Sequence, residues 1–222
     1  MTTPLLECLE IETAPNPTHT VIWMHGLGAD GHDFAGIVTE LGIPSSKAVR
    51  FIFPHAPVQP ITINGGMAMR AWYDIRVPTL IHAEDDQGIY ASEQSVAALI
   101  QHENSRGIPT QNIVLAGFSQ GSAMTLHIGL RYPETLAGMI ALSGYIPLAN
   151  QAAQGWSESN LATPIFLAHG TFDPVVTFDR GTTARDLLLA HHYTVNWHAY
   201  PMPHSVCPEE ISDIADFLHS II

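Results

Sequence analysis

The stretch G-F-S-Q-G at 117–121 places a serine between two glycines, directly after the apolar run 112–118. A strand, a sharp turn and a helix in that order are the context of a nucleophile elbow, in which the serine hydroxyl projects above a sheet. In so tight a turn, side chains on Gly117 and Gly121 would collide with neighbouring backbone. We therefore predict that Ser119 is a nucleophile, and the competing interpretation is a serine that caps the following helix.

A nucleophilic serine needs a base, and the base needs an acid that orients it. Asp173 comes after the apolar run 164–170, where the expected strand ends in a loop. Among the histidines after Asp173, His204 lies on the loop between the expected last strand and last helix. The order Ser119, Asp173, His204 is the order found in α/β-hydrolases. The alternatives are an aspartate that caps its own loop and a surface histidine.

The stretch H-G-L-G-A-D-G-H-D-F at 25–34 carries glycines at the spacing G-x-G-x-x-G, which by itself is a dinucleotide-binding pattern. The acid that this pattern requires about 20 residues further on is missing. Asp30 and Asp33 would also repel a pyrophosphate. Beside a nucleophilic serine the loop has another use, because an oxyanion needs backbone donors. We predict that the N–H groups of Leu27 and Gln120 form this oxyanion hole.

Near-continuous apolar runs bounded by turn residues predict strands that are buried on both faces. They lie at 20–25, 49–54, 112–118, 136–143, 164–170 and 194–201, with an antiparallel edge strand expected at 6–14. Helical spacing of apolar residues predicts helices at 91–107, 120–133, 180–192 and 208–222. Strands that alternate with helices predict an α/β fold with a mostly parallel central sheet and helices on both faces.

The segment 56–88 is rich in proline, glycine and methionine and shows no period. A connection of this length is usually functional, so we expect an irregular, lid-like region beside the site. Exposed apolar residues in it could also provide a homodimer contact. Several side chains are expected to line an acyl pocket, with packing in the core as the alternative for each. They are Met67, Trp72, Tyr145, Phe172 and Met202.

Composition argues against several classes of partner. The chain has 21 acidic residues against 8 lysines and arginines, a formal net charge of −13 and no basic run. Nucleic acids and anionic membrane surfaces are therefore disfavoured as partners. We see no secretory signal and no apolar run long enough to span a bilayer, and we expect Cys8 and Cys207 to be free thiols of a cytoplasmic protein. Histidines are plentiful, but no metal-binding motif such as H-E-x-x-H occurs.

With these motifs in view, the chain resembles the acyl-protein thioesterase and bacterial carboxylesterase family of α/β-hydrolases over nearly its whole length. The resemblance rests on the stretches 25–34 and 117–121, on H-G-T-F-D-P-V-V at 169–176 and on H-S-V-C at 204–207. It implies an α/β-hydrolase fold, with one domain over 1–222 and no large cap.

The same resemblance implies roles for particular residues. The catalytic triad would be Ser119, Asp173 and His204, with Leu27 and Gln120 as the oxyanion donors. The reaction would be hydrolysis of carboxylic esters or thioesters with short to medium acyl chains, without metal or cofactor. The substrates would be small-molecule or lipid-like acyl esters and thioesters, with acylated proteins as a further option. The other functions that remain open are a non-catalytic binding protein of the same fold and a nucleotide oxidoreductase.

Two positions depart from the family pattern. The elbow is often followed by a second glycine, and here the residue is Ser122. Gly144 stands where the family more often carries a larger residue. Neither departure removes catalytic chemistry. Because Gly144 adjoins Tyr145, it leaves the acyl chain-length preference open.

Overall fold

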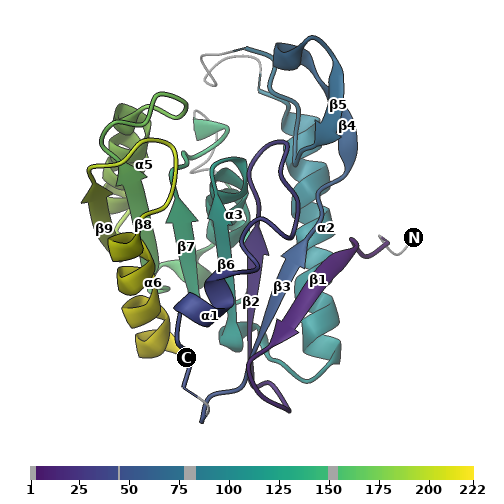
Figure 1. Ribbon diagram of the computed structural model, residues 1–222, viewed down its shortest axis with the longest axis vertical. Coiled ribbons are helices and arrows are strands. Elements are labelled where there is room, and N and C mark those ends of the chain that lie inside the picture. Colours follow the sequence, from purple (N-terminus) through teal and green to yellow (C-terminus); the bar gives the residue numbers. More distant parts are fainter. Residues whose placement is uncertain (1–3, 45, 78–83, 150–154) are drawn as a thin grey trace.

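The computed structural model describes residues 4–44, 46–77, 84–149 and 155–222. These residues form a seven-stranded sheet through the centre of the molecule (Figure 1). Its strands are β1 (Cys8–Glu12), β2 (His19–Met24), β3 (Val49–Pro54), β6 (Ile113–Phe118), β7 (Gly138–Leu142), β8 (Ile165–Gly170) and β9 (Val195–Tyr200). Their order is β1-β3-β2-β6-β7-β8-β9. β1 pairs antiparallel with β3, and all other neighbours are parallel, so the predicted sheet and its edge strand are confirmed.

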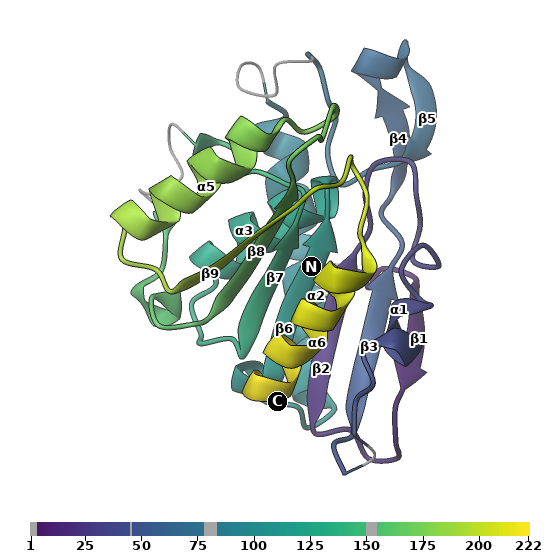
Figure 2. The same ribbon diagram turned by 60° about the vertical axis from the view of Figure 1, so that its left-hand side comes forward.

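Helices cover both faces of the sheet (Figures 1 and 2). They are α1 (Ile37–Glu40), α2 (Asp86–Ser105), α3 (Gln120–Arg131), α5 (Phe178–Ala190) and α6 (Pro208–Ile221), with short 3-10 helices η1 (Thr62–Asn64), η2 (Thr110–Asn112) and η4 (Glu158–Asn160). α1 and α6 pack on one face, and α2, α3 and α5 pack on the other. This is the architecture of an α/β-hydrolase, and within the described ranges no cap domain covers the sheet.

The apolar runs become strands because both faces of the sheet are covered. In β2, Val21 and Trp23 pack on the side of α1 and α6, whereas Ile22 and Met24 pack on the side of α2 and α3. All four side chains are at most 1% exposed. A strand without an exposed face needs no polar residues at alternate positions, which explains why the sequence pattern is continuous.

The segment 56–88 is more regular than its composition predicts. β4 (Val58–Ile61) and β5 (Met67–Arg70) form an antiparallel hairpin that projects beyond the main sheet (Figure 1), and α2 already begins at Asp86. The expectation of an irregular connection therefore needs correction, because strands of four residues are too short to show a period. Part of the segment, 78–83, lies outside the described residues.

The residues predicted to carry out the reaction follow the carboxyl ends of parallel strands. Leu27 comes after β2, Ser119 after β6, Asp173 after β8 and His204 after β9. The carboxyl ends of parallel strands meet at one edge of the sheet, where open α/β sheets bind their ligands. The topology therefore brings together residues that are far apart in the sequence.

Candidate active site

The turn between β6 and α3 has the geometry of a nucleophile elbow. Ser119 adopts φ 55° and ψ −116°, a combination that residues with a side chain rarely adopt. A Cβ atom on Gly117 would lie 2.3 Å from the Gly121 carbonyl, and one on Gly121 would lie 2.1 Å from the Met24 carbonyl oxygen. The predicted collisions are confirmed. The two glycines allow β6, α3 and β2 to approach closely while Ser119 remains partly exposed.

Ser119, His204 and Asp173 form a continuous hydrogen-bonded chain. His204 Nε2 lies 2.8 Å from Ser119 Oγ, and His204 Nδ1 lies 2.6 Å from Asp173 Oδ2. Because a carboxylate oxygen can only accept, Nδ1 of His204 carries the ring proton and donates a hydrogen bond to Asp173. Nε2 is then free to accept from the Ser119 hydroxyl. Such an arrangement can remove the hydroxyl proton while the serine oxygen attacks an electrophile.

The carboxylate of Asp173 is held by its own loop. Its Oδ1 accepts hydrogen bonds from the N–H groups of Val175 at 2.8 Å and Val176 at 2.9 Å. These donors replace the water that burial removes. His169 lies close by, with Nε2 3.6 Å from Asp173 Oδ2 and 2.7 Å from the Val176 carbonyl oxygen. Burial lowers the pKa of His169, so its neutral ring donates to that carbonyl and places no positive charge beside the triad.

The loop after β2 is fixed by a buried histidine. His25 Nε2 accepts from the Ala56 N–H at 3.1 Å, and its Nδ1 donates to the Gly26 carbonyl oxygen at 2.7 Å. Burial lowers the pKa of His25, which agrees with a neutral ring that accepts at one nitrogen and donates at the other. This ring therefore sets the path of the backbone immediately before Leu27.

Two backbone donors remain available near Ser119. No group in the described part of the chain accepts a hydrogen bond from the Leu27 N–H, whereas the next N–H, of Gly28, donates to the Arg70 carbonyl oxygen at 2.9 Å. Gln120 is the first residue of α3, where the backbone N–H has no partner inside the helix. These are the N–H groups predicted to bind an oxyanion.

The side chain of Gln120 ties the elbow to the segment after β5. Its Oε1 accepts from the Trp72 N–H at 2.9 Å, and its Nε2 donates to the Tyr73 carbonyl oxygen at 2.7 Å. The Trp72 indole N–H in turn donates to the His25 carbonyl oxygen at 2.9 Å. Because these groups are buried, the bonds join the elbow, the loop after β2 and the segment after β5 into one rigid unit.

Comparison with known proteins places the chain in a family. The model of the phospholipase/carboxylesterase family matches residues 6–222, which is nearly the whole sequence. The chain belongs to this family. All the residues of the hydrogen-bonded chain and of the loop after β2 lie inside the matched region.

Named relatives and solved structures that are similar to this chain agree with the assignment. Acyl-protein thioesterase 1 of Neurospora crassa is 47% identical over 210 residues, covering 90% of this chain and 86% of that protein. Acyl-protein thioesterase 1 of Yarrowia lipolytica is 41% identical over 214 residues, covering 92% of each. Arabidopsis thaliana SOBER1 has a TM-score of 0.85 at 32% identity, covering 91% of this chain and 98% of that structure. Zea mays acyl-protein thioesterase 2 has a TM-score of 0.80 at 28% identity, covering 96% and 98%.

The side chains expected to contact an acyl chain differ widely in exposure. Met67 and Phe172 are 65% and 69% exposed. Tyr145 and Met202 are buried, and the Tyr145 hydroxyl is paired with a second tyrosine hydroxyl at 2.8 Å. Trp72 is only 1% exposed and its indole N–H is already bonded. The expectation for Trp72 therefore needs correction, because its ring packs beneath the loop after β2 and supports that loop instead of facing a substrate.

The two departures from the family pattern lie in contact with each other. A Cβ atom on Gly144 would lie 2.3 Å from Ser122 Oγ and 3.1 Å from the Ser119 carbonyl oxygen. Ser122 is fully buried, and its hydroxyl has no hydrogen-bond partner among the described residues. The space that a larger residue would fill at 144 is therefore occupied by Ser122. The glycine does not enlarge a pocket beside Tyr145.

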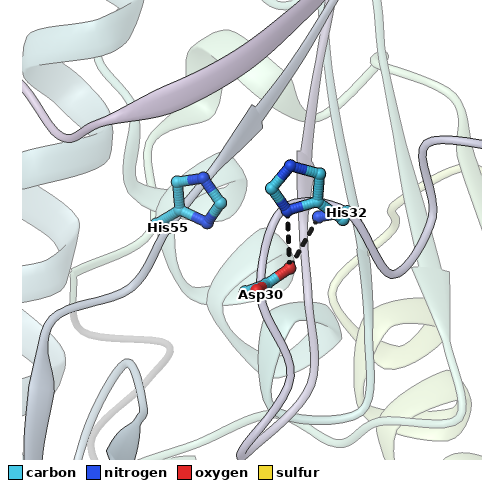
Figure 3. A group of neighbouring side chains, drawn as sticks. All are labelled: Asp30, His32 and His55. Carbon is cyan, nitrogen blue, oxygen red and sulfur yellow. Dashed lines mark hydrogen bonds and ion pairs between the residues drawn. The ribbon is translucent and has the colours of Figure 1, made fainter.

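A cluster of polar side chains lies on the loop after β2, where Asp30 and His32 approach His55 (Figure 3). Their nitrogen and oxygen atoms lie within 4.8 Å of one another. Asp30 Oδ1 accepts from the His32 N–H at 2.8 Å, and His55 Nδ1 accepts from the Gly31 N–H at 3.0 Å. Since Nδ1 of His55 accepts, its Nε2 carries the ring proton and offers no lone pair to a cation. We assign the cluster the role of fixing the loop.

Two histidines that position the site were missed at the level of sequence. His25 supports the oxyanion loop, and His169 lies beside Asp173. Each stands at the end of an apolar run and directly before a glycine. A polar ring in a buried run must find hydrogen-bond partners, and the repeated H-G pair was the signal that could have located both.

Proposed function

We propose that this protein hydrolyses carboxylic esters and thioesters through an acyl-enzyme on Ser119. The observation that carries the proposal is the hydrogen-bonded chain from Ser119 Oγ through His204 to Asp173, on a turn with left-handed φ. A serine that only capped α3 would need neither His204 nor Asp173 beside it. The Ser119 side chain makes no capping hydrogen bond to α3. The family relationship supports the same class of reaction.

In the first half of the proposed reaction, Ser119 Oγ attacks the acyl carbon while His204 Nε2 takes the hydroxyl proton. The carbonyl oxygen becomes an oxyanion that accepts hydrogen bonds from the N–H groups of Leu27 and Gln120. The bond from carbon to the leaving oxygen or sulfur then breaks, and His204 gives its proton to the leaving atom. Asp173 holds the ring and stabilises its positive charge.

In the second half, water loses a proton to His204 and attacks the acyl carbon from the side that the leaving group has vacated. The bond to Ser119 Oγ breaks, the proton returns to that oxygen, and the carboxylic acid departs. His204 carries every proton in this scheme, so the scheme itself calls on no metal or cofactor.

Relatives named acyl-protein thioesterases support a proposal about substrates. We propose lipid-like esters and thioesters with short to medium acyl chains, S-acylated proteins among them. The exposed side chains of Met67 and Phe172 offer apolar surface for such chains. Within the described ranges, no helix combines the length and the apolar character needed to cross a membrane. Cys8 and Cys207 are free thiols, which supports a reducing, cytoplasmic location.

A labelling experiment tests the proposal. A fluorophosphonate probe should modify the native protein at Ser119, and Ser119→Ala should lose both labelling and nearly all hydrolysis of a p-nitrophenyl ester, a fall of roughly 10⁵-fold or more in kcat/KM. The matched control is Ser95→Ala, a partly exposed serine on α2 that should keep both properties. Full activity in Ser119→Ala, or native protein that neither labels nor hydrolyses, would exclude this mechanism.

The proposed substrate range has its own measurement. A series of esters and thioesters that differ only in acyl length should show the highest kcat/KM at short to medium chains, with both leaving atoms accepted. A steady rise to the longest chains, or activity confined to oxygen esters, would contradict the proposed range and leave the serine mechanism standing.

A further inference from the structure

A groove of about 370 Å³ opens beside His204, and no step of the proposed reaction uses it. It lies between α1 and the segment that leads into α6, on the face of the sheet that these two helices cover (Figure 2). Its walls include Asp33, Phe34, Glu40, Phe118, His204 and Val206.

Aromatic rings form a continuous wall from the core to the triad. The ring of Trp23 stacks on Phe34 at 5.3 Å between centroids, and Phe34 meets Phe118 at 5.6 Å. Phe118 in turn contacts the imidazole of His204 at 4.7 Å. Because Phe34 and Phe118 are only partly buried, they present apolar surface to the groove immediately beside the catalytic ring.

The position of His204 identifies which part of a substrate this groove faces. The same nitrogen that takes the proton from Ser119 must deliver it to the leaving oxygen or sulfur. The leaving atom therefore lies next to His204 in the transition state. A groove with His204 in its wall is placed to receive the group that this atom carries, whereas the β4–β5 hairpin lies against the oxyanion loop, where the Gly28 N–H meets Arg70.

Apart from His204, which becomes positive when it takes the serine proton, the charged side chains that line the groove are acidic. Asp33 and Glu40 are exposed and line it, and none of the described residues that line it is a lysine or an arginine. Carboxylates at the rim of an aromatic wall attract an organic cation, because both the ring faces and the carboxylates carry negative potential. An anionic leaving group would meet repulsion at the same place.

We infer that this groove is a leaving-group subsite that selects alcohols and thiols carrying a positive charge near the scissile bond. The inference rests on the proposed function, since it assigns a specificity to the same site. Phe34 and Phe118 contact the apolar part of the cationic group, and Asp33 and Glu40 balance its charge. The acyl chain takes no part in this selection.

Two thioesters of the same acid separate charge from shape. Butyrylthiocholine carries a trimethylammonium group, and its neutral isostere carries a tert-butyl group in the same place. Both release a thiol that a disulfide reagent detects. The quantity of interest is the ratio of kcat/KM for the cationic thioester to kcat/KM for the neutral one. The difference in thiol acidity is common to every enzyme variant, so it cancels when variants are compared.

The test variant is Asp33→Asn combined with Glu40→Gln, and the matched control is Glu158→Gln combined with Asp186→Asn. Both doubles remove two exposed carboxylates, but neither control residue lines the groove. The ratio should fall about three- to tenfold in the test variant, the size expected for two partly exposed charge contacts, and stay at the native value in the control. High salt should reduce the native ratio as well.

Three outcomes would overturn the inference. The ratio could be unchanged in the test variant, whose folding is checked by its thermal melting. It could fall equally in the control, which would show that the net charge of the whole protein attracts the cation. If the native protein hydrolyses neither thioester nor a p-nitrophenyl ester, the proposed function itself falls. Activity on the neutral thioester separates this last case from a failure of the subsite alone.

Discussion

At the scale of single residues, Ser122 and Gly144 show how two unusual choices depend on each other. Each is a departure from the family pattern when it is considered alone. In the structure a side chain at either position occupies the same small volume beneath the elbow, close to the Ser119 carbonyl oxygen. The pair therefore preserves the packing under the nucleophile, and it carries no information about acyl length.

This contact leads to a prediction about stability. Gly144→Ala alone should lower the free energy of unfolding by about 1–3 kcal/mol, because its Cβ would overlap Ser122 Oγ. Adding Ser122→Gly should recover most of the loss. Urea denaturation of the two single variants and the double variant gives the coupling energy. Strictly additive effects would show that the two positions do not share this volume.

At the scale of secondary-structure elements, a buried ion pair fastens α2 to the sheet. Glu103 on α2 is fully buried, and its Oε2 meets Arg50 Nη1 on β3 at 2.7 Å and the Thr20 hydroxyl on β2 at 2.5 Å. Arg106 reaches the other oxygen, Oε1, at 2.9 Å. Glu103 lies on the buried face of α2 with Val96, Leu99 and Ile100, and its partners on two strands explain why an acid is tolerated there.

Removing the acid from this pair should be costly. Glu103→Ala removes the buried partner of Arg50 Nη1 and of the Thr20 hydroxyl, whereas Arg50 keeps Glu12 at 3.0 Å. The free energy of unfolding should therefore fall by roughly 3 kcal/mol. Glu7→Ala, an exposed glutamate before β1, should change it by less than about 0.5 kcal/mol. Equal melting temperatures for the two variants would show that the pair does not hold α2 in place.

At the scale of the whole molecule, stability depends on pH through a carboxyl group in the first turn of α6. Burial, assisted by the nearby Asp213, raises the pKa of Glu210 to about 8. The folded pKa exceeds that of the unfolded chain, so the favourable contribution is complete below about pH 4.3 and is lost as the pH rises through about 8. Ionisation of Glu210 at alkaline pH therefore weakens the packing of α6 against the rest of the protein.

A pair of variants in the same helical turn tests this dependence. Glu210→Gln should match the native protein near pH 5 and exceed its stability by a few kcal/mol near pH 9, because the amide cannot ionise. Glu209→Gln, whose side chain is exposed, should follow the native curve throughout. The measurement is the urea midpoint of each protein across this pH range. If the midpoints of Glu210→Gln and native protein change with pH in the same way, Glu210 is not the source of the pH dependence.

The assembly of the molecule is a further question at this scale. The β4–β5 hairpin and its turn expose Val58, Ile63 and Met67 by 62%, 41% and 65%. The homodimer contact expected from the segment 56–88 stays a prediction, and a mass measurement in solution tests it.

The sequence by itself determined the succession of strands and helices along the chain. Strands buried on both faces leave continuous apolar runs, and helices buried on one face leave apolar residues at helical spacing. It also placed Ser119, Asp173, His204 and Leu27 at the ends of strands, because the residues on either side of each one mark the end of an apolar run and the start of a turn. The motifs could be read because glycines at a tight turn leave a short and specific pattern.

Only the tertiary structure decided which neighbours these residues have. The support given by His25 and the filling of the Gly144 space by Ser122 join positions far apart in the chain. The short β4–β5 hairpin and the acidic aromatic groove beside His204 emerge in the same way. Contacts of this kind depend on how elements pack against each other, so the hydrophobic period of a single segment cannot predict them.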